Sequence, residues 1–165
     1  MKFAVENTPS GKTIVAGLTH TSLERIIALP CHVADLGVRA GLLPCPYYFP
    51  NSFSMALEFF SVLDWASDLE IVLYDNPVYT KTWLSAEELF IVLDACPRIT
   101  GVKVTDHDLI TALKKSRKAA VFSGDAVVAF RSLLLGVDGS MIIAPSIFPA
   151  AYSDRRAPSR GEPAG

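Results

Sequence analysis

RITGVKVTDHD, residues 98–108, combines the pattern of a buried strand with a single lysine. Ile99, Val102 and Val104 predict a strand that is covered by other parts of the molecule, and Lys103 lies among them. Transferring an ammonium group from water into an apolar interior is costly. Two explanations are open: Lys103 lies on an edge strand and reaches out to water, or it lies in a pocket where it reacts.

Apolar runs of this kind alternate along the chain with longer amphipathic segments. We expect strands at residues 13–18, 41–48, 70–77, 99–105, 119–125 and 139–146. We expect helices at residues 19–29, 51–67, 85–96, 108–118 and 127–137, two of them with capping boxes, Thr21 with Glu24 and Ser85 with Glu88. This alternation predicts a parallel sheet covered by helices, and the continuous apolar strands fit a sheet that is buried on both faces.

Two architectures fit this pattern. One is an open, doubly wound parallel sheet of six strands, which suits the length and which the pattern alone slightly favours. The other is a (β/α)₈ barrel, which usually needs about 250 residues and two more strands than we expect here. In either case we expect one domain over residues 1–149. Residues 150–165 are polar and rich in Pro, Gly and Arg, and we expect them to be disordered.

Composition excludes several classes of protein. Half of the 165 residues are apolar and 19% are charged, and the formal net charge is −2. No strong field favours nucleic acid or an anionic membrane, and no apolar run has the ~18 residues of a membrane span. Three cysteines without a CxxC spacing, Cys31, Cys45 and Cys96, indicate buried thiols in a reducing compartment. Since no signal peptide is recognisable either, we expect a cytoplasmic protein.

Chemistry in parallel α/β proteins is located at the carboxyl ends of the strands. Lys103 and Thr105 are expected there, together with Tyr74 and Asp125. A lysine in dry surroundings loses its proton more easily and can attack a ketone to form a Schiff base, with a tyrosine as proton carrier. Other readings stay open: Tyr74 as a packed core tyrosine, His20 as a surface histidine and Asp125 as a helix cap. No metal-ligand set, GxGxxG or P-loop occurs, so we expect no metal and no cofactor.

Several segments, in order, resemble the dihydrodipicolinate synthase / N-acetylneuraminate lyase family. IVAGLTHTS resembles the third strand of that family and its turn, and LLPCPYYFPNS resembles the fourth strand with its Pro-Tyr-Tyr turn. IVLYDNPVYT is similar to the fifth strand. ITGVKVTDHDL resembles the strand that carries the Schiff-base lysine. VFSGDAVVAFRSLLLGVDGSMI resembles the Ser-Gly-Asp turn, the next helix and the following strand.

The resemblance implies a (β/α)₈ TIM-barrel fold, of which this chain holds about six βα units, corresponding to strands three to eight. It implies a lyase or aldolase that joins pyruvate, or another 2-oxo acid, to an aldehyde or cleaves the product. Lys103 is then the amine that forms the imine, and Tyr74 is the proton-relay phenol beside it. Tyr48 reaches across a dimer interface into the neighbouring site of a homo-oligomer. Gly124 and Met141 match positions that line the lysine pocket through their backbones.

Three positions depart from the family pattern. Val104 stands where an acidic or small residue is usual, and His107 stands where a glycine is often found. Tyr79 occupies the position at which the synthase proper has an arginine that binds the carboxylate of the aldehyde. A phenol cannot offer the charged fork of a guanidinium. Tyr79, which we expect to bind substrate together with Thr105, therefore favours an aldolase of sugar acids or hydroxy-oxo acids.

The first two βα units of the family have no counterpart in this sequence, so we expect a truncated member. With them the turn that binds the pyruvate carboxylate is missing, and we expect weak or no turnover by this chain alone. The alternative is a non-catalytic remnant that acts as an interaction or assembly partner, with Tyr47, Tyr48 and Phe49 as its adhesive surface. An unrelated open-sheet binding domain also fits, and in it Tyr74 and Lys103 need not lie within reach of each other.

Overall fold

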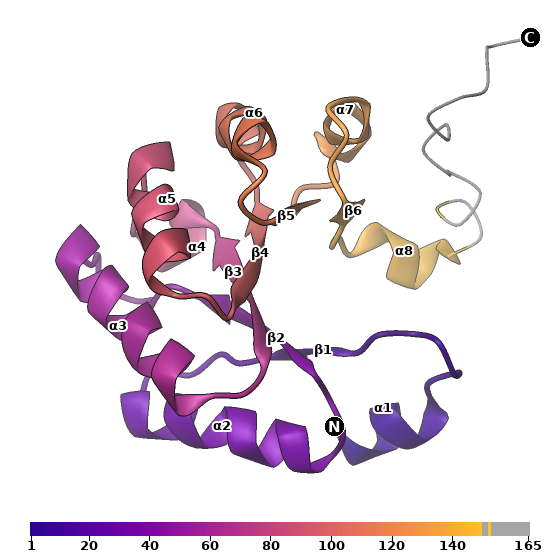
Figure 1. The fold of residues 1–165 in the computed structure, drawn as a ribbon. Helices are drawn as coiled ribbons and strands as arrows, with labels where there is room; N and C mark the ends of the chain where they lie inside the picture. The colour runs from indigo at the N-terminus through magenta and orange to yellow at the C-terminus, as the bar shows by residue number, and fades with distance from the viewer. Residues whose placement is uncertain (150–151, 153–165) are drawn as a thin grey trace, which may run out of the picture.

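A computed structural model of the protein describes residues 1–149 and residue 152. Six parallel strands form one sheet, in which each strand pairs with the next one along the chain. They are β1 (Val15–Gly17), β2 (Ala40–Pro44), β3 (Glu70–Asp75), β4 (Ile99–Val104), β5 (Ala120–Ser123) and β6 (Gly139–Ser140). The sheet curls into a half-barrel, as Figure 1 shows.

Helix α1 (Lys2–Asn7) precedes β1, and helices follow each of the strands. They are α2 (Leu23–Asp35), α3 (Phe53–Ala66), α4 (Pro77–Thr80), α5 (Ala86–Ala95), α6 (His107–Ser116), α7 (Ala129–Leu134) and α8 (Ala144–Ile147). In Figure 1, helices α2, α3, α5, α6 and α7 lie one after another along the convex side of the sheet. The concave side, which is the inside of a barrel, carries no helix from this series.

The strand order decides between the two predicted architectures. A doubly wound sheet reverses its strand order at a switch point and carries helices on both faces. Here the order β1-β2-β3-β4-β5-β6 never reverses, so the partial TIM barrel is confirmed and the open sheet is wrong. Because β4 lies between β3 and β5, Lys103 is not on an edge strand, and the edge explanation for this lysine is also wrong.

The core lies between the sheet and the helix layer. Ile99, Val102 and Val104 of β4 are buried, as the apolar pattern predicted. The helices contribute side chains such as Phe60 and Ile110, which are fully buried. Each apolar side chain of this size stabilises the fold by roughly 1.5–3 kcal/mol when it leaves water. This layer therefore holds the sheet in its curled form.

One of the two predicted capping boxes is present. The Ser85 side chain accepts a hydrogen bond from the Glu88 N–H at 3.2 Å, and the Glu88 carboxylate accepts one from the Ser85 N–H at 2.8 Å. The box predicted for Thr21 and Glu24 is wrong, because α2 has Ser22 as its N-cap. The Ser22 N–H donates to Nδ1 of the half-buried His20 at 2.9 Å instead, so an imidazole takes part in this turn.

The strand predicted over residues 139–146 is shorter than expected. β6 contains only Gly139 and Ser140, and residues Ala144–Ile147 form α8. Pro145 explains the change, since it has no N–H for a strand ladder and favours the first turn of a helix. Pro77 acts in the same way after β3, where it begins the short helix α4 in a segment that was predicted as strand.

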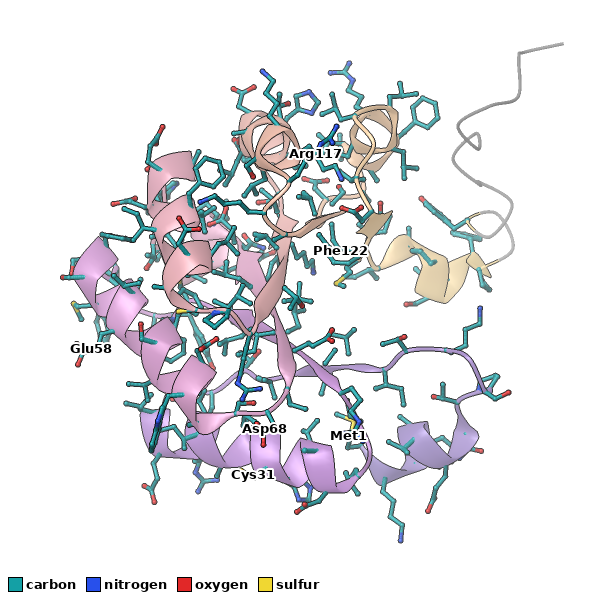
Figure 2. The ribbon with its side chains drawn as sticks, in the orientation of Figure 1. Met1, Cys31, Glu58, Asp68, Arg117 and Phe122 are labelled. Carbon is teal, nitrogen blue, oxygen red and sulfur yellow. The ribbon has the colours of Figure 1, made fainter. Side chains whose placement is uncertain are left out.

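Three further predictions concern the surface and the ends. Cys45 and Cys96 are buried, but Cys31 is exposed on α2, so the prediction of three buried thiols is wrong for Cys31 (Figure 2). None of the helices in the described part of the chain is long and apolar enough to cross a membrane. The tail predicted at residues 150–165 falls, apart from residue 152, outside the described residues.

A buried carboxyl group lies behind the sheet at the end of β3. Asp75 is only 3% exposed and lines a cavity with Leu84 and Leu109, on the side of the helix layer. Burial, and secondarily the nearby charge of Asp106, raises the pKa of Asp75 from 3.8 to about 7. The thiol of Cys45 shares this environment: burial, with a smaller contribution from Asp75, raises the pKa of Cys45 to about 12. Cys45 is therefore an inert core thiol.

The raised pKa of Asp75 predicts that the protein loses stability as the pH rises. The stabilising contribution of the protonated form is fully present below the unfolded pKa of 3.8 and is lost as the pH rises through about 7. Asp75→Asn removes the ionisable group, so we expect it to raise the free energy of unfolding by on the order of 2–4 kcal/mol at about pH 8, and by less at about pH 5. Denaturant unfolding at both pH values measures this, with the exposed Asp108→Asn as matched control. Equal pH dependence in the wild type and in Asp75→Asn contradicts the prediction.

Candidate functional site

Strand register places one residue from each of five strands at the same level of the half-barrel. Pro44 pairs with Tyr74, Tyr74 with Lys103, Lys103 with Phe122, and Phe122 with Gly139. Residues that pair in neighbouring parallel strands point to the same face of the sheet. That face is the concave one, where Figure 2 shows Phe122. Lys103 and Tyr74 are therefore neighbours on the inside of the half-barrel.

The amine of Lys103 lies on the ring of Tyr74. Its Nζ atom is 3.8 Å from the centre of that ring, and both side chains are half-buried. An ammonium group over an aromatic face is attracted by the ring quadrupole, by about 0.5–2 kcal/mol depending on exposure. The ring therefore fixes the position of the amine. The expectation that these two residues lie close together is met, and the unrelated binding domain that would separate them is not supported.

The phenol hydroxyl is held by a residue that the sequence analysis did not single out. Asn76 is buried, and its side-chain N–H donates to the Tyr74 hydroxyl oxygen at 2.7 Å. Because the oxygen accepts this bond, the phenol proton is left to be donated elsewhere. Among the described residues no hydrogen bond joins the hydroxyl to Lys103, since the amine lies over the ring face instead. Asn76 follows Tyr74 by two positions, a same-face spacing that could have indicated it.

Gly124 leaves the space through which the lysine side chain passes. A Cβ atom at this position would lie 3.0 Å from Lys103 Cε and 3.2 Å from Thr105 Cγ2. The Gly124 N–H donates to the Val104 carbonyl at 2.7 Å, which fixes the turn after β5 against the end of β4. Lys103, Thr105 and Gly124 therefore pack together at the carboxyl ends of β4 and β5.

A groove of about 630 Å³ opens at this edge of the sheet. It brings together five of the residues that we singled out, namely Tyr74, Tyr79, Thr105, Gly124 and Asp125. Lys103 lies next to it through its contacts with Tyr74 and Gly124. Met141 is not among the lining residues; its N–H donates to the Ser123 carbonyl at 2.8 Å and ties the chain after β6 to β5.

Tyr48 projects from the loop after β2 and takes no part in this groove. Its side chain is 76% exposed and packs edge-on against Phe49, with ring centres 5.1 Å apart. Its φ angle is +91°, a region that a bulky residue rarely adopts and that costs on the order of 1–3 kcal/mol. The backbone is therefore held in a strained shape that turns an aromatic side chain outward.

Asn51 holds this loop in place, and the sequence analysis missed it. Its side-chain N–H groups donate to the carbonyls of Pro46 at 2.8 Å and Phe49 at 3.1 Å, and to the Thr82 hydroxyl at 3.0 Å. Its backbone N–H also donates to the Thr82 hydroxyl, at 3.1 Å. Such bonds join the loop after β2 to the segment after α4. The turn-forming pair Pro50-Asn51 was the available signal, but its partner 31 positions away was not.

Asp125 accepts a hydrogen bond from the Val127 N–H at 2.7 Å, which closes a local turn. It does not cap α7, because the N-cap of that helix is Val128, without a side-chain hydrogen bond, so the interpretation of Asp125 as a helix cap is wrong. In the part of the chain that the structure describes, no three His, Cys, Asp or Glu side chains gather as they would around a metal ion.

The chain is similar to one family of enzymes over most of its length. A model of the Dihydrodipicolinate synthetase family matches residues 3–154. The 4-hydroxy-tetrahydrodipicolinate synthase of Herminiimonas arsenicoxydans is 29% identical over 154 residues, which are 90% of this chain and 52% of that relative. The enzyme of the same name from Methanothrix thermoacetophila is 31% identical over 144 residues, which are 84% of this chain and 48% of that relative. The chain spans about half the length of these curated relatives.

Solved structures give the same result. The chloride-inhibited dihydrodipicolinate synthase from Acinetobacter baumannii, complexed with pyruvate, superposes with a TM-score of 0.86 at 30% identity, over 93% of this chain and 54% of that one. The 2-keto 3-deoxygluconate aldolase from Picrophilus torridus superposes with a TM-score of 0.77 at 25% identity, over 86% of this chain and 52% of that one. With its half-barrel and a family match over residues 3–154, this chain belongs to the dihydrodipicolinate synthetase family.

Proposed function

We propose that this protein is a Schiff-base lyase or aldolase in which Lys103 forms an imine with pyruvate or another 2-oxo acid. The observation that carries the proposal is the position of the Lys103 amine, 3.8 Å from the centre of the Tyr74 ring on the concave face of the half-barrel. A relative with 30% identity was solved in complex with pyruvate, which supports the choice of substrate.

The chemistry follows from the two side chains. The neutral Lys103 amine attacks the ketone carbon of pyruvate, and loss of water from the carbinolamine gives the imine. The protonated imine withdraws electrons, so a methyl proton of bound pyruvate leaves and an enamine forms. The enamine carbon attacks the carbonyl carbon of an aldehyde, whose oxygen takes up a proton. Water then releases a 4-hydroxy-2-oxo acid and restores the amine; the reverse sequence cleaves that acid.

Tyr74 is the proton carrier in this proposal. Its oxygen accepts the Asn76 hydrogen bond, so its own proton is available to the carbinolamine oxygen. A positioned acid or base of this kind contributes roughly 10²–10⁴-fold to the rate. Thr105 and Gly124 shape the space beside the amine, and Met141 supports the neighbouring strand ends through its backbone.

We further propose that Tyr48 completes the site of a neighbouring molecule in a homo-oligomer. Its exposure, its positive φ and the Asn51 hydrogen bonds support this role, because they fix an aromatic side chain that points away from its own groove. We expect weak turnover by the chain alone, because the half-barrel leaves its concave face open to water and solvation weakens the electrostatic stabilisation of the imine.

A second candidate function rests on the same exposed residues. Tyr48 is 76% and Phe49 71% exposed, which suits a non-catalytic chain that binds a partner through these rings. Reductive trapping distinguishes the two functions, because only the enzyme labels Lys103.

Sodium borohydride in the presence of pyruvate should reduce the imine and label Lys103 irreversibly. We expect Lys103→Ala to abolish this adduct, because no other amine lies over the Tyr74 ring among the described residues. Peptide mass spectrometry locates and quantifies the label, and Lys115→Ala on α6 is the matched control. A label spread over surface lysines, or one that persists in Lys103→Ala, would falsify the proposal.

Tyr74→Phe should slow the proton transfers without removing the amine that is labelled. The phenylalanine ring still supports the amine, so borohydride should still label Lys103, but the missing hydroxyl should slow the loss of water from the carbinolamine and, with it, the exchange of the pyruvate methyl protons through the enamine, by about a hundredfold. Proton NMR in deuterium oxide measures that exchange directly. Unchanged exchange in Tyr74→Phe would assign the relay to another group.

Gly124→Ala should displace the lysine without unfolding the protein. The added methyl group would lie 3.0 Å from Lys103 Cε, so the side chain must shift, and we expect borohydride labelling to slow by about tenfold, the effect of a misplaced reacting group. Gly17→Ala in β1 is the control, because nothing lies within 4 Å of its Cβ position. Equal labelling rates in the two variants, at equal melting temperatures, would show that Gly124 does not position the amine.

A further inference from the structure

The residues that line the groove beside Lys103 indicate which kind of second substrate fits there. Its described lining includes a continuous set of apolar and aromatic residues: Pro77, Val78, Tyr79, Ile142, Ile143 and Ala144. They come from α4 and from the segment after β6, up to the first residue of α8. Val78, Tyr79 and Ile143 are well exposed, which leaves these side chains free to contact a bound molecule.

The groove is next to the reacting amine. Tyr74, whose ring supports the Lys103 amine, lines it, and so does Gly124, against which the lysine side chain packs. An imine formed on this amine would lie beside the groove, from which a second substrate can approach it.

The charged side chains in the described lining of the groove are acidic. Asp106 and Asp125 line it, and each is fixed by a hydrogen bond from the backbone, Asp106 from the Leu109 N–H at 2.8 Å and Asp125 from the Val127 N–H at 2.7 Å. The described lining contains no lysine, arginine or histidine. A pyruvate imine adds no anchoring charge either, since its positive nitrogen is balanced by its own carboxylate.

We infer that the aldehyde partner of this enzyme is uncharged, with an apolar or hydroxylated chain, and that the groove discriminates against aldehydes that carry a carboxylate or a phosphate. This inference rests on the proposed function of Lys103. The apolar walls supply contact area for such a chain, and the Tyr79 hydroxyl can hydrogen-bond to a hydroxyl group on it. An anionic chain would meet two carboxylates and no cation among the described lining residues, since the nearby Lys81 ammonium, outside that lining, is already bound to the Val78 carbonyl at 2.6 Å.

A matched pair of aldehydes tests this on the full chain. Butyraldehyde and succinic semialdehyde share a four-carbon skeleton and differ in a terminal methyl or carboxylate group. With pyruvate as donor, we expect the aldol product of butyraldehyde to form at least about tenfold faster, as a difference of one charge-assisted contact would give. Faster reaction of succinic semialdehyde overturns the inference while leaving the Schiff base on Lys103 intact.

Two sets of variants show whether the lining causes the preference. The double variant Asp106→Asn with Asp125→Asn keeps the backbone hydrogen bonds, since the asparagine side-chain oxygen also accepts them, and should raise the rate with succinic semialdehyde relative to the rate with butyraldehyde. Tyr79→Arg should raise the relative rate with succinic semialdehyde by about tenfold more, because a guanidinium can donate two charge-assisted hydrogen bonds to a carboxylate. No change in the ratio of the two rates in either variant contradicts the inference.

A binding measurement keeps the inference testable if no pyruvate adduct forms at Lys103, which would end the proposed function. Butanamide and succinamate are unreactive analogues of the same pair, with a methyl or a carboxylate at one end. Saturation-transfer NMR should show contact of butanamide with the protein, reduced in Tyr79→Ala, and weaker contact of succinamate. Equal or stronger contact of succinamate, or no contact of either, overturns the inference.

Discussion

The register of the parallel strands is the constraint on which the rest of this structure depends. Lys103 of β4 pairs with Tyr74 of β3 on one side and with Phe122 of β5 on the other. A shift of β4 by one residue would turn Lys103 toward the helices and bring Val104 to the inside. Burial of Val102 and Val104 against the helix layer opposes that shift, so the apolar core holds the amine on the concave face.

Strand alternation gives β3 a different chemistry on each face. Tyr74 faces the groove, and the next residue, Asp75, faces the helix layer, where burial raises its pKa to about 7. A charged Asp75 would be solvated poorly and would lie near Asp106, which belongs to the acidic lining of the groove. The Asp106 carboxylate therefore acts on both sides of the sheet: it raises the pKa of the buried Asp75, and it adds negative charge to the groove. A substitution of Asp106 is expected to change both properties together.

Much of the fold could be predicted from the sequence, because apolar runs and capping residues act locally. The strand around Lys103 and the capping box at Ser85 are confirmed for this reason. The curl of the sheet could not be derived from the pattern, since an open sheet and a partial barrel share the same alternation of strands and helices, and only the family resemblance favoured the barrel. The helix at Ala144–Ile147 was missed because its apolar residues also suit a strand.

The candidate site, like the fold, could be predicted from the sequence only in part. Lys103 and Tyr74 are 29 positions apart by their numbers, and only strand pairing brings them to one level. Chemical type suggested both, whereas the contact between amine and ring face, in place of a hydrogen bond to the phenol, depends on side-chain geometry that no periodicity encodes. Asn76 then has a reason to be buried beside them: it occupies the phenol oxygen, so the ring can support the amine with one face while its hydroxyl proton stays available. Positioning and proton transfer are thus assigned to two parts of one side chain, which is why removing the hydroxyl and removing the amine have different consequences.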